Sequence, residues 1–131
     1  MKAWPLRLSP GADLKRSLEA LDGAAGFVVA AIGSLDPVVL RYAGAAQATR
    51  LAGAFELLTL SGSLTRDGAH LHMSVADAEG RVRGGHVVYG CIVRTTAEVL
   101  VADLPGFSLS RESDAATGFR ELVVRPAGAA A

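Results

Sequence analysis

From Phe27 onward the chain is a series of short apolar runs separated by turns rich in glycine and aspartate. Such runs are typical of β-strands, and the short turns between them predict hairpins. Because hairpins place neighbouring strands antiparallel, the pattern predicts a mainly antiparallel sheet. We expect about seven strands, over residues 27–32, 38–42, 55–64, 70–76, 81–88, 91–102 and 119–124. The unbroken apolar run 27–32 is typical of a strand that is buried on both faces.

One segment before these strands has a helical period instead. Leu14, Leu18 and Leu21 recur at the spacing of one helical face, and Asp13 is well placed to cap the first turn. Asp22 and the glycine after it can end the helix. A single helix that packs on one face of an antiparallel sheet gives an α+β fold.

The chain length of 131 residues is that of one domain and is long enough to bury a core. No internal repeat and no linker divides the sequence. We therefore expect a single domain over residues 1–125. Residues 126–131, which are mostly alanine and glycine, are expected to form a flexible C-terminal tail.

Half of the residues are hydrophobic, only 20% are charged, and the formal net charge is zero. This composition excludes a disordered chain. It also leaves little charge to cover a monomer, which indicates a further buried surface between subunits. No apolar run reaches the roughly 18 residues of a membrane-spanning helix, and no signal peptide is evident, so we expect no membrane partner. A lone cysteine, Cys91, favours the reducing cytoplasm.

The three histidines of the chain all lie between residues 70 and 86. His70 and His72 are two residues apart on an expected strand, so their side chains leave the same face, with Cα atoms roughly 6.5 Å apart. His86 lies on the returning strand. Three imidazoles without a fixed carboxylate resemble a catalytic zinc shell with an open fourth position. We therefore predict a divalent metal, zinc or another ion, bound by His70, His72 and His86.

The predicted register sets a condition on this site. If Ala76 lies opposite Arg81 across a four-residue turn, His72 lies opposite a glycine and His86 points the other way. One extra residue on the returning strand, such as a bulge at Gly84-Gly85, would bring His86 to the pair, and so would a neighbouring subunit. The alternative is that the histidines are polar residues on a solvated sheet face. Cys91 is an alternative fourth ligand, although a buried, inert thiol is its usual role.

A long, ordered set of motifs resembles the plant and prokaryote conserved (PPC or PCC) domain. This domain is found in plant AT-hook nuclear proteins and as stand-alone bacterial and archaeal proteins. The resemblance runs from about Leu6 to Val124. The motifs that carry it most clearly are Phe55-Glu56-Leu57-Leu58-Thr59-Leu60-Ser61-Gly62, His70-Leu71-His72, Gly84-Gly85-His86 and Gly90-Cys91-Ile92-Val93.

The resemblance implies a homotrimer of α/β domains, with the three histidines near a subunit boundary and able to bind zinc in some members. It places Glu56, Gly84 and Gly85 in the same pattern. Stand-alone bacterial members usually carry the label of predicted DNA-binding proteins. In plant members a separate AT-hook, with an Arg-Gly-Arg core, grips the minor groove of DNA. This chain lacks that core, and Arg81-Val82-Arg83, on an expected strand, is the nearest match.

These observations favour a homotrimeric binding or regulatory module that assembles with itself and with a protein or small-molecule partner. The zero net charge disfavours direct DNA binding, because phosphate neutralisation needs an excess of lysine and arginine. The alternative is a metal-dependent enzyme of the hydrolase or lyase type. In that case the three-histidine site would activate water, with Glu56 or Glu98 as the acid or base.

Overall fold

The computed structural model describes residues 1–23 and 25–128 of the chain. This part contains one short helix, α1 (Leu14–Glu19), and ten strands. In chain order the strands are β1 (Lys2–Leu8), β2 (Ala25–Leu35), β3 (Val38–Arg41), β4 (Thr49–Leu51), β5 (Phe55–Thr65), β6 (Gly68–Ala76), β7 (Val82–Val87), β8 (Val93–Asp103), β9 (Phe107–Ser113) and β10 (Arg120–Pro126).

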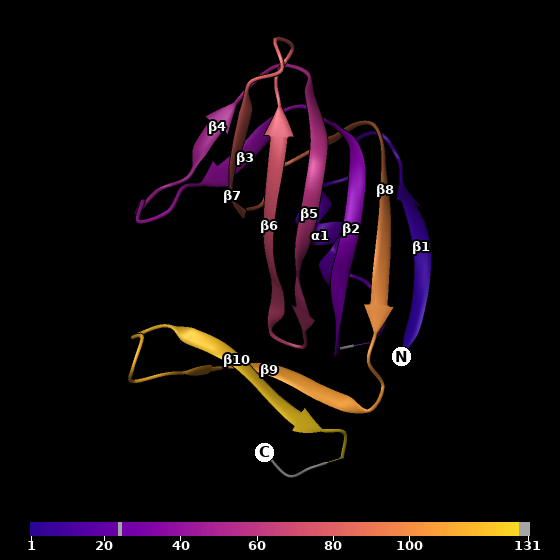
Figure 1. Ribbon diagram of the computed structural model, residues 1–131, viewed down its shortest axis with the longest axis vertical. Coiled ribbons are helices and arrows are strands. Elements are labelled where there is room, and N and C mark those ends of the chain that lie inside the picture. Colours follow the sequence, from indigo (N-terminus) through magenta and orange to yellow (C-terminus); the bar gives the residue numbers. More distant parts are fainter. Residues whose placement is uncertain (24, 129–131) are drawn as a thin grey trace.

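Eight strands form one antiparallel sheet in the order β1-β8-β2-β5-β6-β7-β3-β4, and β9 pairs with β10 in a separate hairpin. Figure 1 shows α1 behind one face of the sheet, and the β9–β10 hairpin across its lower end. We call the face that α1 covers the inner face and the opposite one the outer face. This architecture confirms the expected domain, an antiparallel sheet with one helix. In the described part of the chain, no helix is long and apolar enough to cross a membrane.

The helix begins where the sequence predicts. The Asp13 carboxylate accepts a hydrogen bond from the backbone N–H of Arg16 at 3.1 Å, which caps the first turn. Leu14 and Leu18 are fully buried in the core against the inner face. The regular helix ends at Glu19, before the Asp22 that the sequence suggested as its end.

The outer face of β2 corrects one expectation. Phe27, Val29 and Ile32 are 37%, 54% and 57% exposed, so the strand is not buried on both faces within the chain. The reason is that none of the described elements covers the middle of the outer face. The apolar run therefore reflects an apolar surface on that side and core packing on the other.

The structure has three strands that the sequence pattern did not predict, namely β1, β4 and β9. Strand β1 contains Pro5, which is tolerated because β1 is an edge strand. Strand β4 has only three residues. In β9 the buried positions are Leu109 and Ser110, so no apolar alternation marks it as a strand. The expected C-terminal tail begins at Pro126, which ends β10, and residues 129–131 lie outside the described residues.

Candidate metal site

The three histidines come together on the outer face, at the end of the sheet nearer the β9–β10 hairpin. His70 and His72 lie on β6, and His86 lies on β7. One ligand nitrogen from each ring lies within 4.8 Å of the other two. The rings of His70 and His86 are stacked, with centroids 5.6 Å apart, and His72 lies edge-on to both.

The turn between β6 and β7 sets the register that makes this cluster. Ala76 lies opposite Val82, so His72 lies directly opposite His86. The turn therefore has five residues, Asp77 to Arg81. It is closed by the Asp77 carboxylate, which accepts hydrogen bonds from the N–H groups of Glu79 and Arg81 at 2.9 and 3.0 Å. The required extra residue lies in the turn, and neither a bulge in β7 nor a neighbouring subunit is needed.

The two glycines before His86 have a different role from the one expected. A Cβ at Gly84 would lie 2.9 Å from the carbonyl oxygen of Met73 on β6. A Cβ at Gly85 would lie 2.8 Å from the carbonyl oxygen of Arg41 on β3. The glycines therefore allow β7 to pack closely between its two neighbours.

The geometry of the cluster fits a metal ion. His72 Nε2 and His86 Nδ1 are 3.1 Å apart. In a tetrahedral zinc site with Zn–N bonds of about 2.0–2.1 Å, two ligand nitrogens are separated by about 3.3 Å. The His70 ligand nitrogen lies within 4.8 Å of both. The group contains no carboxylate or thiolate, so its donor set is three imidazoles.

The surroundings keep two of these imidazoles in the form that binds metal. Burial, followed by the positive charge of Arg111, lowers the pKa of His70 below its ordinary value. Burial, followed by the charge of Arg41, lowers the pKa of His86. Both rings are therefore neutral near pH 7, and neutral imidazole is the metal-binding form.

The other candidate residues do not join the group. The Cys91 thiol lies in the core, where its Sγ donates to the carbonyl oxygen of Val39 at 3.2 Å and accepts from the N–H of Val39 at 3.3 Å. Burial raises the pKa of this thiol to about 11. Glu56 and Glu98 lie on β5 and β8, and within the described ranges neither belongs to a cluster of metal-ligand atoms.

One residue beside the site was missed by sequence reasoning. The guanidinium of Arg111, on β9, donates a hydrogen bond to Ser63 Oγ on β5. Ser63 is the cross-strand neighbour of His70. The contact joins residues 48 positions apart and depends on how the hairpin folds back on the sheet, so no local pattern could have identified it.

Next to the histidines, the outer face has an apolar hollow of about 780 Å³. It crosses β1, β8, β2 and β5. Its most exposed large side chains are Val29, Ile32, Leu58 and Leu100. The register partners Arg7 and Glu98 lie at its rim.

Comparison with known proteins shows relatives that cover most of the chain. Residues 1–105 match the family model of the Plants and Prokaryotes Conserved (PCC) domain. The bifunctional protein GlmU of Synechococcus sp. (strain JA-2-3B'a(2-13)) is 48% identical over 130 residues, which cover 96% of this chain and 21% of that protein. The chain thus spans about a fifth of the length of the curated relatives it matches.

Two solved structures are similar over nearly the whole chain. A hypothetical protein from Salmonella enterica has a TM-score of 0.93 and 38% identity, with 96% of this chain and 94% of that chain covered. A metal-containing protein from Archaeoglobus fulgidus has a TM-score of 0.82 and 28% identity, with 94% of each chain covered. Both similarities extend beyond the region that the family model matches.

Proposed function

Because the chain belongs to the Plants and Prokaryotes Conserved (PCC) domain family, we propose that it is a homotrimeric binding module with a regulatory role, built around a divalent metal site. The metal ligands in this proposal are His70, His72 and His86. The partner is a small molecule or a protein that reaches the outer face.

The observation that carries the proposal is the convergence of three ligand nitrogens within 4.8 Å on one exposed face. Three imidazoles hold a divalent ion and leave a coordination position for an external ligand. The metal-containing protein from Archaeoglobus fulgidus has the same fold, which supports the proposal of a metal site. Zinc is the ion we favour, because imidazole is one of the ligands that suit it.

Zinc titration by calorimetry tests the metal site. We expect about one zinc per chain for the unaltered protein and loss of that binding in His72→Ala. Ser74→Ala is the matched control, because Ser74 is the next outward-facing residue on β6 and its hydroxyl forms a hydrogen bond with Thr59 and not with a histidine. Negligible zinc binding by the unaltered chain would contradict the proposal, and so would equal binding by the His72→Ala variant.

The apolar hollow supports self-assembly. Contiguous exposed apolar surface of this kind marks an interaction site in a folded protein. A second copy is the proposed occupant, because Arg7 and Glu98 at the rim provide opposite charges on every copy. In solution we expect a mass three times that of the 13.5-kDa chain, measured by light scattering after size-exclusion chromatography. A particle with the mass of one chain would contradict it.

Direct DNA binding is not part of the proposal. The net charge is zero, and the thirteen lysines and arginines are spread along the whole chain. Non-specific affinity for DNA depends on unpaired basic groups that release counterions. We expect no shift of random duplex DNA in a gel assay, even at low salt.

We also propose that the protein is cytoplasmic, because a free cysteine is typical of a reducing compartment.

A further inference from the structure

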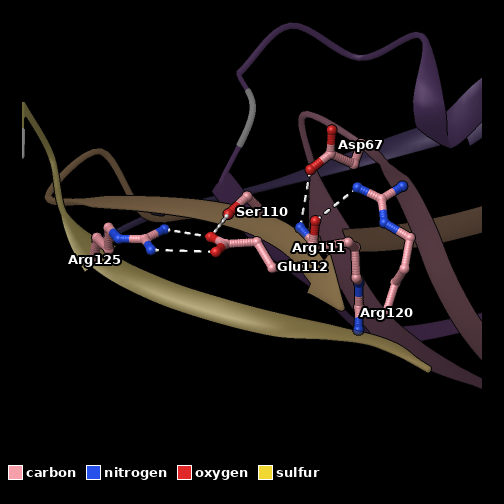
Figure 2. A network of polar contacts seen from close by, with 6 residues as sticks. All are labelled: Asp67, Ser110, Arg111, Glu112, Arg120 and Arg125. Carbon is pink, nitrogen blue, oxygen red and sulfur yellow. Dashed lines mark hydrogen bonds and ion pairs between the residues drawn. The ribbon is translucent and has the colours of Figure 1, made fainter. Parts of the chain in front are cut away.

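Arg111 is held against the metal-site end of the sheet by its backbone. Its N–H donates to the Asp67 carboxylate at 2.9 Å, and its carbonyl oxygen accepts from the Arg120 guanidinium at 2.7 Å. Figure 2 shows both contacts to the Arg111 backbone. Arg111 lies beyond residues 1–105, the part of the chain that matches the family model.

The side chain of Arg111 extends toward the histidines. One guanidinium nitrogen, Nη2, donates to Ser63 Oγ. Ser63 and His70 are directly opposite on β5 and β6. Cβ atoms of such partners are about 4.5–5.5 Å apart, so the guanidinium lies beside the imidazole of His70.

The charge of Arg111 is not neutralised by a protein carboxylate. Within the described part of the chain the ion pairs involve Arg81 and Arg125, and no carboxylate oxygen lies within 4.0 Å of the Arg111 guanidinium. Its Nε and Nη1 also have no hydrogen-bond partner among the residues described. A planar guanidinium with free donors is suited to bidentate binding of a carboxylate or phosphate group.

The electrostatic balance around the histidines is positive even before an ion binds. Arg111 lies on one side of the cluster, and Arg41, opposite His86 on β3, lies on the other. The imidazoles add no negative charge, and Glu121 is the acidic group that acts on His70. The two guanidinium groups therefore weaken the binding of a divalent cation, and an anion bound beside it would offset their charge.

We propose that this face binds a small oxyanion, a carboxylate or phosphate group, as the external ligand of the histidine-bound metal, with the Arg111 guanidinium holding the same group. The inference rests on the metal site of the proposed function. It identifies the ligand class of that site. Because coupling between two ligands is reciprocal, an oxyanion that tightens metal binding is itself bound more tightly when the metal is present.

The test uses the full chain loaded with cobalt(II), whose visible absorption reports the ligands of the ion. Acetate and inorganic phosphate are titrated in separate arms at constant ionic strength. We expect one or both to change the spectrum saturably and to tighten cobalt binding. A response to acetate alone identifies a carboxylate ligand, and a response to phosphate alone identifies a phosphate group.

The matched variants are Arg111→Ala, Arg111→Lys and Arg50→Ala. We expect Arg111→Ala to lower the affinity for the anion by about tenfold to a hundredfold, as for loss of a charge-assisted hydrogen bond. Its affinity for cobalt without an anion should be equal to or higher than that of the unaltered chain, because a repelling charge is gone. Arg111→Lys should give an intermediate loss. Arg50→Ala removes the same charge from the edge strand β4, two strands away from β7, and should change nothing.

The outcomes separate the two proposals. If the unaltered chain binds no cobalt, the proposed metal site is wrong. If it binds cobalt but neither anion alters the spectrum, the metal site stands and the oxyanion inference is overturned. Equal anion binding by Arg111→Ala and the unaltered chain overturns the role of Arg111. Cobalt binding by the Arg111→Ala variant shows that the variant is folded.

Discussion

Gly62 is the residue at which the backbone of the metal site is most constrained. It has φ of +152°, and a Cβ there would lie 1.9 Å from the carbonyl oxygen of His70. Its neighbours in the sequence, Ser61 and Ser63, lie opposite His72 and His70. A shift of β5 away from β6 at this point would therefore break the strand pairing that supports two of the metal ligands.

Gly62→Ala should destabilise the fold by roughly 2–4 kcal/mol, because the new methyl group meets backbone and the φ value is unfavourable for alanine. Urea denaturation measures the change. Gly106→Ala is the control, since a Cβ at Gly106 would meet nothing within 4 Å and should alter stability by less than about 0.5 kcal/mol. Equal stability of the two variants would contradict this prediction, because it would show that β5 and β6 accommodate the methyl group without loss of stability.

At the residue scale, the histidines could be identified from sequence and the arginine could not. His70 and His72 lie two apart on a strand, so the strand period alone puts them on one face. The face on which His86 lies depends on the length of the β6–β7 turn. The sequence did not predict that length, and it offered a bulge or another subunit instead. Arg111 reaches the site through tertiary packing of the hairpin, and nothing in residues 107–113 indicates where that hairpin folds.

At the element scale, Glu19 ties α1 to the sheet. Its carboxylate accepts a hydrogen bond from the N–H of Ala69 at 2.9 Å and another from the Tyr89 hydroxyl at 2.5 Å. The hydrogen bond to Glu19 is the main reason that the pKa of Tyr89 is raised. The helix has only six residues, so its position depends on such contacts and on its buried leucines more than on its own helical stability.

Glu19→Ala should therefore lower the pKa of Tyr89 toward the ordinary tyrosine value of about 10. The phenolate absorbance reports it, with Tyr42→Phe as the background that removes the other tyrosine. Because folding raises this pKa, the stabilisation from the contact is complete below about pH 10 and is lost as the pH rises through the folded pKa. The variant should also lose about 1 kcal/mol from the hydrogen bond to Ala69.

The control for this tether is Glu79→Ala, which removes an exposed carboxylate from the β6–β7 turn. It should leave the titration of Tyr89 unchanged. If Glu19→Ala also left that titration unchanged, the hydrogen bond would not exist in solution.

The elements differ in how well the sequence predicts them, and the reason is physical. Helix α1 has a capping aspartate and leucines at helical spacing, and both signals are local. Strands β5 and β6 alternate in burial along much of their length, with Leu57, Leu60, Leu71 and Met73 in the core. Strand β9 is stabilised mainly by pairing with β10 and by contacts with the Thr65–Gly68 turn, which a single short segment does not reveal.

At the scale of the whole molecule, the open outer face predicts that assembly depends on a few apolar side chains. Ile32 is 57% exposed within the hollow. Ile32→Glu should prevent assembly of the proposed trimer, because a buried unpaired carboxylate is costly at the centre of an interface. Folding should be little affected, since this side chain is exposed in the single chain.

Light scattering and circular dichroism together measure this outcome. Val82→Glu is the matched control, because Val82 is 60% exposed on β7 and does not line the hollow. The proposed interface would be wrong if Ile32→Glu kept the mass of the unaltered protein, or if Val82→Glu dissociated it equally. A zinc titration of the dissociated variant would then show whether the histidine site works in one chain, as the geometry of β6 and β7 leads us to expect.

The five-residue turn between β6 and β7 has a consequence for how such a site is gained and lost in evolution. Side chains alternate between faces, so deletion of one residue from the turn would rotate His86 to the inner face while every histidine remained in the sequence. Reinsertion would restore it. A relative that retains all three histidines but has one residue more or fewer in this turn would thus lack the three-histidine cluster. Turn length is therefore a better diagnostic of inheritance of the site than the histidines alone.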